Sequence, residues 1–255
     1  MPEPHFITRL IGYFRDDRLG YVQTPHAFYN FDSFQARLDH ENRHYWEEGH
    51  AFYYVIQPRR NYWGCPIFAG SATMFRRTAI CDVGLMATET ITEDLHTGLR
   101  MNAKGWRSIA INERLVAGQA DPDITTFHAQ RMRWGTGNLS IMNYDNPLFM
   151  RGLTLPQRLC YLGSMLHWAS GIFKLILYLT PIAMLFSGIP PVKELTPELI
   201  VVTLIYLIVS LATMKIVSDG YGSIINSELF SMVNFWTQIK STFRATLVSA
   251  VDSSM

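Results

Sequence analysis

The sequence predicts an α/β layered domain followed by two membrane-spanning helices and an amphipathic helix. Short apolar stretches typical of strands alternate with helical periodicity over the first 150 residues. Charged side chains become scarce after that: residues 165–255 contain ten, and the first 164 residues hold the other 33. The chain therefore changes solvent along its length, from a water-facing part to a lipid-facing part.

Composition excludes several classes of protein. The 255 residues include 22 Lys and Arg against 21 Asp and Glu, a formal net charge of +1. This balance excludes a polybasic nucleic-acid binder, so no nucleic-acid partner is expected. The three cysteines, Cys65, Cys81 and Cys160, form no CxxC pair, which argues against a disulfide framework and a cysteine zinc site. A reducing cytosol for the first part of the chain fits this pattern.

Residues 1–150 are predicted to form a cytosolic domain of alternating helices and strands. Apolar residues on one side predict a helix over 4–16, and an apolar run predicts a strand over 21–23. Asp32 or Ser33 can cap a long aromatic helix over 34–56, which Pro58 should end. Residues 66–71 and 73–75 are expected to form a strand pair or one bent strand.

The second half of this domain continues the alternation. A loop over 84–90 precedes a helix that Thr92 caps and Gly105 ends. A strand follows over 108–111. The next helix is expected to start at Thr125 or Thr126 and to run to about residue 142.

Two apolar segments within residues 159–217 are predicted to cross a bilayer. The first covers 159–192 with only Lys174 charged, and the second covers 199–217 with only Lys215 charged. Each supplies the ~20 residues that a bilayer requires. The alternative is a pair of buried helices in a soluble core, although so long an uncharged run is rare in a chain of this length.

Charges beside these segments predict their orientation. Arg151 and Arg158 precede the first segment, which places residues 1–150 on the cytoplasmic side. Lys193 and Glu194 then lie in a short external loop, and the second segment returns the C-terminus to the cytoplasm. We expect a multi-pass protein of a plasma or bacterial inner membrane, with the lipid bilayer as a partner.

The tail, residues 224–250, is predicted to be one amphipathic helix. Its apolar stripe has members three or four residues apart: Ile225, Leu229, Met232, Trp236, Ile239, Phe243 and Leu247. Such a helix can lie in the plane of a membrane interface. It can equally pack as an ordinary amphipathic helix on the cytosolic domain, and both interpretations remain open here.

Two short strings carry the candidate chemistry. In the first, Thr92 caps a helix whose first turn contains Glu93 and Asp94, where the helix dipole favours ionised carboxylates. Such a carboxylate can accept the proton of an attacking sugar hydroxyl. The plainer alternative is an ordinary helix start, for which this string is common.

In the second string, residues 130–134, Gln130, Arg133 and Trp134 share one helical face. Arginine offers forked donors to phosphate oxygens, an indole stacks on a sugar ring, and glutamine bonds hydroxyls. The alternative is an amphipathic helix with one buried tryptophan.

Together, and upstream of the apolar segments, these strings resemble the family 2 membrane glycosyltransferases, most closely the bacterial cellulose synthases. The resemblance covers residues 2–189. It rests on the segments 22–26, 68–71, 76–77, 92–94, 105–106, 117–118, 130–134 and 155–162.

The resemblance implies roles for both strings. The aspartate of the family's Thr-Glu-Asp motif is the general base, which assigns Asp94, with Glu93 beside the substrate. The arginine of Gln-x-x-Arg-Trp contacts the nucleotide diphosphate, which assigns Arg133. The tryptophan stacks on the acceptor sugar, which assigns Trp134, with Gln130 next to it.

A third motif, Phe-x-Cys-Gly-Ser, lines the acceptor end of the family's site. It assigns Phe68, Gly70 and Ser71 to substrate binding, although Ala69 replaces the cysteine. The implied fold is the latter half of a GT-A type glycosyltransferase domain.

The implied reaction is inverting transfer from a UDP-sugar donor, UDP-glucose, to a growing β-glucan acceptor, with Mg²⁺ or Mn²⁺ on the diphosphate. The family's metal-binding motif, Asp-x-Asp-His, does not occur in this chain. We therefore expect a fragment that neither binds UDP nor transfers sugar by itself, within a protein whose partners include further synthase subunits. The alternative is a non-catalytic, membrane-anchored remnant that binds a glycan or a partner.

Overall fold

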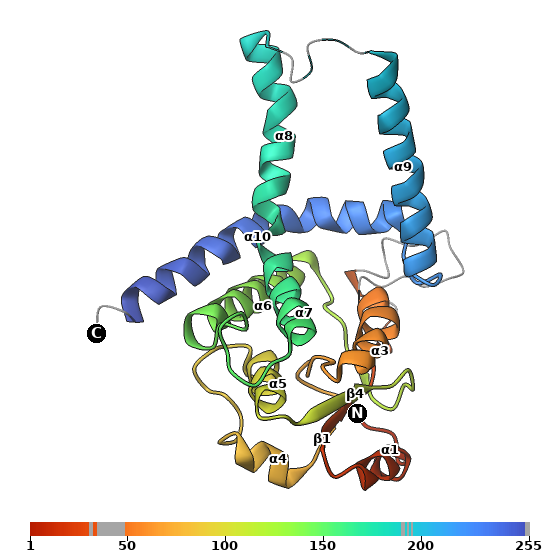
Figure 1. The fold of residues 1–255 in the computed structure, drawn as a ribbon, viewed down its shortest axis with the longest axis vertical. Coiled ribbons are helices and arrows are strands. Elements are labelled where there is room, and N and C mark those ends of the chain that lie inside the picture. Colours follow the sequence, from red (N-terminus) through yellow and green to blue (C-terminus); the bar gives the residue numbers. More distant parts are fainter. Residues whose placement is uncertain (31–32, 35–48, 190–191, 193, 195, 253–255) are drawn as a thin grey trace.

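The computed structural model describes residues 1–30, 33–34, 49–189, 192, 194 and 196–252. Residues 1–30 and 49–154 form most of the layered domain, from which two long helices project (Figure 1). Its elements are α1 (Phe6–Leu10), η1 (Ile11–Arg15), β1 (Leu19–Gln23), β2 (Ala27–Phe28), the π-helical turn η2 (Phe52–Ile56), α3 (Gln57–Arg59), η3 (Arg60–Trp63), β3 (Thr73–Phe75), α4 (Arg77–Asp82), α5 (Glu93–Ala103), β4 (Arg107–Ala110), β5 (Ala117–Gly118) and α6 (Ile124–Tyr144).

A three-stranded sheet in the order β3-β1-β4 lies at the centre of the domain. β1 pairs antiparallel with β3, in the register Val22 to Met74, and parallel with β4, in the register Val22 to Ile109. β2 and β5 form a separate parallel pair. The predicted strands over 21–23 and 108–111 are thus confirmed within a residue or two.

The predicted strand over 66–71 is wrong, whereas residues 73–75 form β3. The side chain of Gln23 takes the place of a neighbouring strand: its Oε1 accepts from the Ala69 N–H at 2.9 Å and its Nε2 donates to the Ser71 carbonyl at 2.8 Å. The backbone then bends through positive φ at Gly70 and Ala72. These residues form an extended loop, which we call the 68–72 loop.

Most of the long helix predicted over 34–56 lies outside the described residues. Its last part is helical, but Pro58 does not end it. Pro58 occupies the first turn of α3, directly after the π-helical turn η2, and proline is tolerated in a first helical turn. The helix continues as η3 and stops at Gly64, whose φ is +63°.

The ends of α5 and α6 follow the predictions in part. Thr92 is the N-cap of α5, but its hydroxyl caps no N–H. α6 starts at Ile124 rather than at 125 or 126, because Asp123 accepts from the Thr126 N–H at 2.9 Å. The helix continues two residues beyond the predicted end, to Tyr144.

The first predicted apolar segment contains two helices with different surroundings. α7 (Leu155–Leu166) packs into the domain, where Tyr161 and Met165 are fully buried beside Leu99 and Ile141. After the short turn η4 (His167–Ala169), α8 (Ser170–Ser187) leaves the domain and is largely exposed. The change from protein surroundings to an exposed apolar surface therefore falls near residue 170.

The second segment forms α9 (Pro197–Val217), in which no residue is buried. By length and composition, the helices over Leu155–Ser187 and Pro197–Val217 are both sufficient to cross a membrane. They stand as two columns on the same side of the domain (Figure 1).

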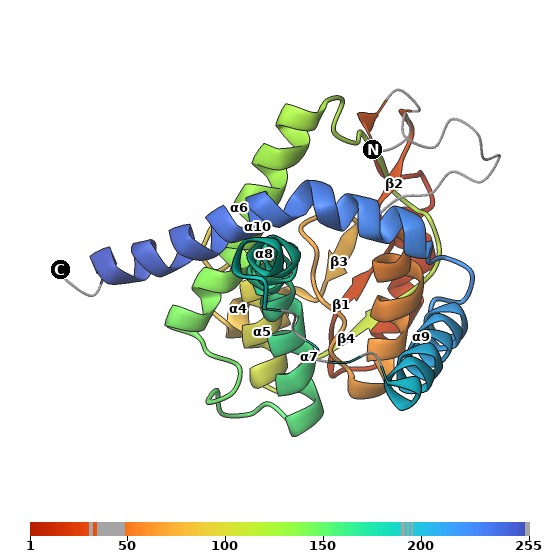
Figure 2. The same ribbon diagram turned by 90° about the horizontal axis from the view of Figure 1, so that it is seen from above.

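α10 (Ile224–Asp252) lies across the base of these columns, against α6 and α8 (Figure 2). Its buried face is mixed and contains the polar side chains of Asn234, Thr237, Gln238 and Ser241 together with Phe230, Ile239 and Ala245. The apolar stripe defined above, apart from the buried Ile239, is exposed. The helix therefore packs on the domain and still leaves an apolar face uncovered.

Candidate active site

Asp94 lies in the first turn of α5, directly over the 68–72 loop. A Cβ built on Gly70 would lie 2.9 Å from the Asp94 Oδ2, so the loop can approach the carboxylate this closely only as glycine. Gly70 also has φ +80°, a conformation that glycine tolerates best. Two motifs that are over 20 residues apart in the sequence thus meet at one point.

The Asp94 carboxyl is half-buried, and burial raises its pKa to about 6. The neighbouring Glu93 carboxylate acts in the same direction, whereas the Leu95 N–H, which donates to Oδ1 at 2.7 Å, and the Arg133 guanidinium lower the pKa. A carboxylate with this pKa is mostly ionised at neutral pH and accepts a proton more readily than an ordinary one.

The second string approaches this point along α6. A Cβ on Gly137 would lie 2.5 Å from the Thr92 Cγ2, so α6 crosses directly over the start of α5. Residues 130, 133, 134 and 137 share this side of the helix. Arg133 is exposed, and its charge acts on Asp94.

Trp134 and Gln130 both contact Arg131, so they are less available to a substrate than the resemblance implies. The Arg131 guanidinium carbon lies 4.6 Å from the Trp134 ring and 4.3 Å from the Phe127 ring. The Gln130 Oε1 accepts from Arg131 at 2.6 Å, which leaves its amide NH₂ to donate. Trp134 and Trp168 form a T-shaped pair, with ring centroids 6.4 Å apart. A sugar would therefore meet an indole that is already stacked on one cation.

The remaining predicted residues divide between surface and core. Glu93 is exposed, and Ser71 faces solvent beside Gly70. Phe68 is a correction: only 4% of it is exposed, and its ring packs on Tyr21 and Phe75. Its aromatic side chain anchors the 68–72 loop in the core instead of facing the open site.

Sequence reasoning missed a histidine at the same loop. The His26 Nε2 lies 2.9 Å from the Ser71 Oγ, and its Nδ1 lies 2.8 Å from the Tyr53 hydroxyl. Burial lowers the pKa of His26, so its ring is neutral at pH 7. The signal was available, because His26 ends the 22–26 segment that carries part of the resemblance.

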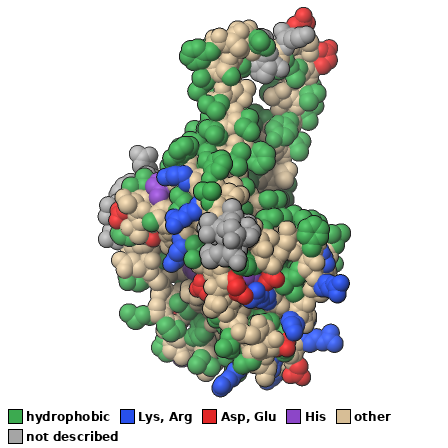
Figure 3. All heavy atoms as spheres, turned by 90° about the vertical axis from the view of Figure 1, so that its left-hand side faces the viewer, with side chains coloured by type: hydrophobic (Ala, Val, Ile, Leu, Met, Phe, Trp, Pro, Cys, Tyr) green, Lys and Arg blue, Asp and Glu red, His purple; other side chains and the backbone are tan. Residues whose placement is uncertain are grey.

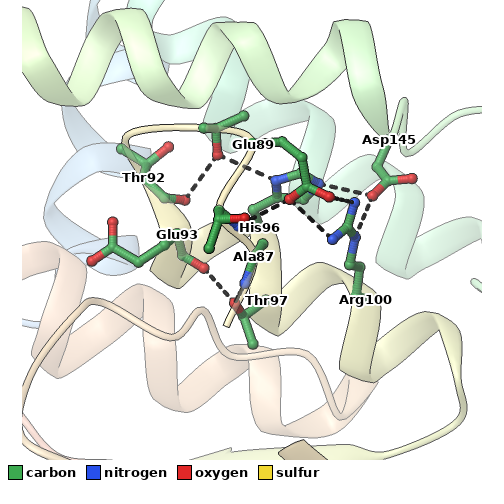
Figure 4. Close-up of polar contacts among 10 residues, drawn as sticks. Ala87, Glu89, Thr92, Glu93, His96, Thr97, Arg100 and Asp145 are labelled. Atoms are coloured by element: carbon green, nitrogen blue, oxygen red, sulfur yellow. Dashed lines mark hydrogen bonds and ion pairs between the residues drawn. The ribbon is translucent and has the colours of Figure 1, made fainter. Parts of the chain in front are cut away.

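Sequence reasoning also missed a network of ion pairs centred on a buried histidine of α5 (Figure 4). His96 is fully buried, with its Nε2 2.8 Å from the Asp145 Oδ2. Arg100 donates to the same oxygen at 2.6 Å and pairs with Glu89 at 2.9 Å. Figure 4 shows Glu93 pointing away from this network. The network joins α5 to the end of α6 and so fixes the helix that carries Asp94.

Burial sets the charge state of His96, and hydrogen bonds from Arg100 set that of Glu89. Burial lowers the pKa of His96, although Asp145 opposes the shift. Hydrogen bonds from Arg100 lower the pKa of Glu89 to about 2. The ring of His96 is therefore neutral at pH 7, while Asp145, Arg100 and Glu89 form the charged part.

The described residues do not fit a divalent metal site. Within 1–30, 49–189 and 196–252, no group of three or more His, Cys, Asp or Glu side chains converges to hold an ion.

Comparison of the fold identifies the class of the domain. The structure is similar to a mannosyltransferase from Pyrobaculum calidifontis, solved in complex with GDP-Man and Mn²⁺, with a TM-score of 0.57 over 96% of this chain and 59% of that one. The sequences are 14% identical, so the likeness shows the fold alone. The domain is an α/β, GT-A-like glycosyltransferase fold.

Comparison of the sequence gives the family. The family described as glycosyl transferase family group 2 matches residues 1–215, and this chain belongs to it. A cellulose synthase catalytic subunit (UDP-forming) from Komagataeibacter sucrofermentans is 35% identical over 246 residues, 96% of this chain and 31% of that protein. A putative cellulose synthase 2 from Komagataeibacter xylinus is 40% identical over 189 residues, 74% of this chain and 12% of that protein. The chain thus spans less than a third of these relatives.

Proposed function

We propose that this chain supplies the acceptor side and the general base of an inverting membrane glycosyltransferase. In this proposal the enzyme transfers glucose from UDP-glucose to the end of a growing β-glucan. The observation that carries the proposal is the Asp94 carboxyl, held over Gly70 with its pKa raised to about 6. The family and its cellulose synthase members support the choice of donor and acceptor.

The reaction needs one base. A hydroxyl of the acceptor attacks C1 of the donor sugar and forms the new C–O bond, while its proton passes to the Asp94 carboxylate. The bond from C1 to the diphosphate breaks on the opposite face, and its electron pair leaves with UDP. Attack opposite the leaving group inverts C1, so a second carboxylate is not required.

Other side chains receive binding roles in this proposal. The exposed Arg133 guanidinium suits the diphosphate oxygens of the donor. Ser71 and Glu93 offer hydrogen bonds to acceptor hydroxyls, and Gln130 offers its amide NH₂. Trp134 stacks on the acceptor sugar with the face that Arg131 does not cover. His26 orients the Ser71 hydroxyl.

The membrane arrangement belongs to the same proposal. α8 and α9 cross the bilayer, the layered domain lies on the cytoplasmic side, and α10 lies in the interface plane. The exposed apolar surfaces of α8, α9 and the α10 stripe support this placement. Because the domain and α10 lie at the same end of the columns, the stripe meets the bilayer where the columns enter it (Figure 1). Further subunits of a synthase complex would share this membrane.

A chimera tests the activity. The part of this chain that matches the Komagataeibacter sucrofermentans catalytic subunit replaces its counterpart in that protein, and membranes receive radiolabelled UDP-glucose, UDP-N-acetylglucosamine or GDP-mannose. We expect an insoluble product from UDP-glucose that a β-1,4-glucanase digests. Product from another donor, with none from UDP-glucose in correctly inserted chimera, would overturn the assignment.

A further inference from the structure

A second binding surface lies between α6 and α10. It is a groove of about 520 Å³, lined mainly by His128 and Met132 of α6 and by Trp236, Thr237 and Lys240 of α10. His128 lies half a turn around α6 from Gly137, the residue that contacts Thr92. The groove therefore faces away from the candidate active site and has no role in the chemistry proposed there.

The polar groups of the groove suit an anion. Lys240 is exposed at its rim, and Arg131 and Lys240 both lie close enough to lower the pKa of His128, after burial as the main cause. The His128 Nδ1 lies 2.8 Å from the Thr237 hydroxyl. When that hydroxyl donates, the neutral ring carries its proton on Nε2 and is itself a donor. The groove thus offers an anion the Lys240 ammonium and the His128 Nε2–H, and His128 does not need to be protonated for this.

The apolar side of the groove is continuous with the α10 stripe. Trp236 belongs to both, and 53% of it is exposed. On the face shown in Figure 3, Lys and Arg side chains and a histidine gather at the upper rim of the domain, directly below the apolar columns. Tryptophan and lysine at such a boundary are typical of side chains that contact lipid headgroups.

We propose that this groove binds the phosphate of an anionic membrane phospholipid. Lys240 and His128 hold the phosphate oxygens, Trp236 lies at headgroup depth, and the acyl chains continue along the apolar stripe of α10. The proposal rests on the membrane placement proposed above, because a phospholipid reaches the groove only when α10 lies in the interface. A bound phosphate would fix the depth of α10 in the membrane interface and the rotation of α10 about its own axis.

The test uses residues 1–255 in nanodiscs of phosphatidylcholine and phosphatidylglycerol, with the lipids that the protein retains counted by native mass spectrometry. Lys240→Gln is compared with Arg244→Gln, which removes the same charge from an exposed position one turn farther along α10, outside the groove lining. We expect Lys240→Gln to reduce selective retention of phosphatidylglycerol about tenfold, the effect of losing one charge-assisted hydrogen bond. Arg244→Gln should change it less than about threefold, as for one exposed charge that salt screens.

A second arm separates lipid from free phosphate. Inorganic phosphate is titrated in phosphatidylcholine nanodiscs, where the proposal expects no Lys240-dependent thermal shift below millimolar concentrations. Equal losses in the two variants would overturn the proposal, as would inorganic phosphate binding as tightly as the lipid. Carbonate extraction reports membrane insertion separately. Insertion without phosphatidylglycerol selectivity would refute only the groove, and failed insertion would refute the membrane placement as well.

Discussion

Asp94 and His96 lie two residues apart on α5, and burial drives both toward their neutral forms. It raises the pKa of Asp94 to about 6 and lowers that of His96. Desolvation always disfavours the charged form, so the two shifts have opposite signs and one cause. The difference lies in their partners: His96 has the Asp145 carboxylate, whereas Asp94 faces the bare backbone of Gly70.

Asp94→Asn should stabilise the folded chain at neutral pH. The pKa of Asp94 is raised above its unfolded value of 3.8, so its contribution to folding is fully present below pH 3.8 and is lost as pH rises through about 6. The neutral amide avoids this loss and still accepts from Leu95. We expect a gain of about 2 kcal/mol at pH 8 and none at pH 3.5, measured by denaturant unfolding in detergent. A gain that is equal at both pH values would contradict the buried carboxylate.

His96→Ala should destabilise the domain by about 2–3 kcal/mol. The change removes a fully buried ring that bonds to Asp145 and leaves a cavity behind α5. His5→Ala, at an exposed position before α1, is the control and should change stability by less than about 0.5 kcal/mol. Similar urea midpoints for the two variants would show that the network does not hold α5 in place.

At the scale of elements, glycines set how closely the helices approach. A Cβ on Gly135 of α6 would lie 2.4 Å from the Ser241 Oγ of α10, and a Cβ on Gly171 of α8 would lie 2.5 Å from the Phe235 carbonyl. These close approaches let α10 pack tightly on α6 and α8. The apolar stripe is left uncovered as a consequence.

Gly135→Ala should therefore weaken the attachment of α10. The added methyl group overlaps Ser241, which we expect to cost about 1–3 kcal/mol. Gly163→Ala in α7 is the matched control, because nothing lies within 4 Å of its built Cβ. It should stabilise by up to about 1 kcal/mol through helix propensity. Thermal unfolding in detergent compares the two, and shifts of the same sign would contradict the packing described.

The topology of α8 and α9 is tested by labelling. In a background with Cys81→Ser, Glu194→Cys should react with a membrane-impermeant maleimide in intact spheroplasts. Arg151→Cys, on the domain, should react only after lysis. The reason is that Arg151 precedes α7, which packs into the domain, whereas Glu194 follows the far end of α8. Reaction of Glu194→Cys only after lysis would exclude the proposed orientation.

Local sequence patterns predicted most helices and strands, because the apolar periodicity of each element depends only on the residues of that element. They could not predict the 68–72 loop, since the Gln23 side chain that replaces a strand partner comes from over 40 residues away. An apolar sequence does not show whether a helix is buried in a protein core or in lipid. For this reason the sequence predicted one apolar segment where the structure has α7 and α8. The site strings were found from residue types, whereas the His96–Asp145 pair joins positions 49 residues apart and left no local signal.

At the scale of the whole molecule, α6 lies between the candidate active site and the helix α10. The candidate active site lies where α5, α6 and the 68–72 loop converge, and α6 itself carries α10 on another side. Figure 2 shows α10 running over α6 and past the end of α8. In our proposal the sugar chemistry on α6 therefore occurs one helix layer from the membrane surface.

The central claim is that Asp94 is the base of a glycosyltransferase, and the pH dependence of transfer by the chimera tests it most directly. Because the pKa of Asp94 is about 6 and its ionised form accepts the proton, kcat/KM for UDP-glucose should fall about tenfold per pH unit below pH 6. Asp94→Asn should bind UDP normally, lose about 10²–10⁴-fold in rate and lack this acidic limb. Near-full turnover in Asp94→Asn, or the same acidic limb in both proteins, would contradict the account.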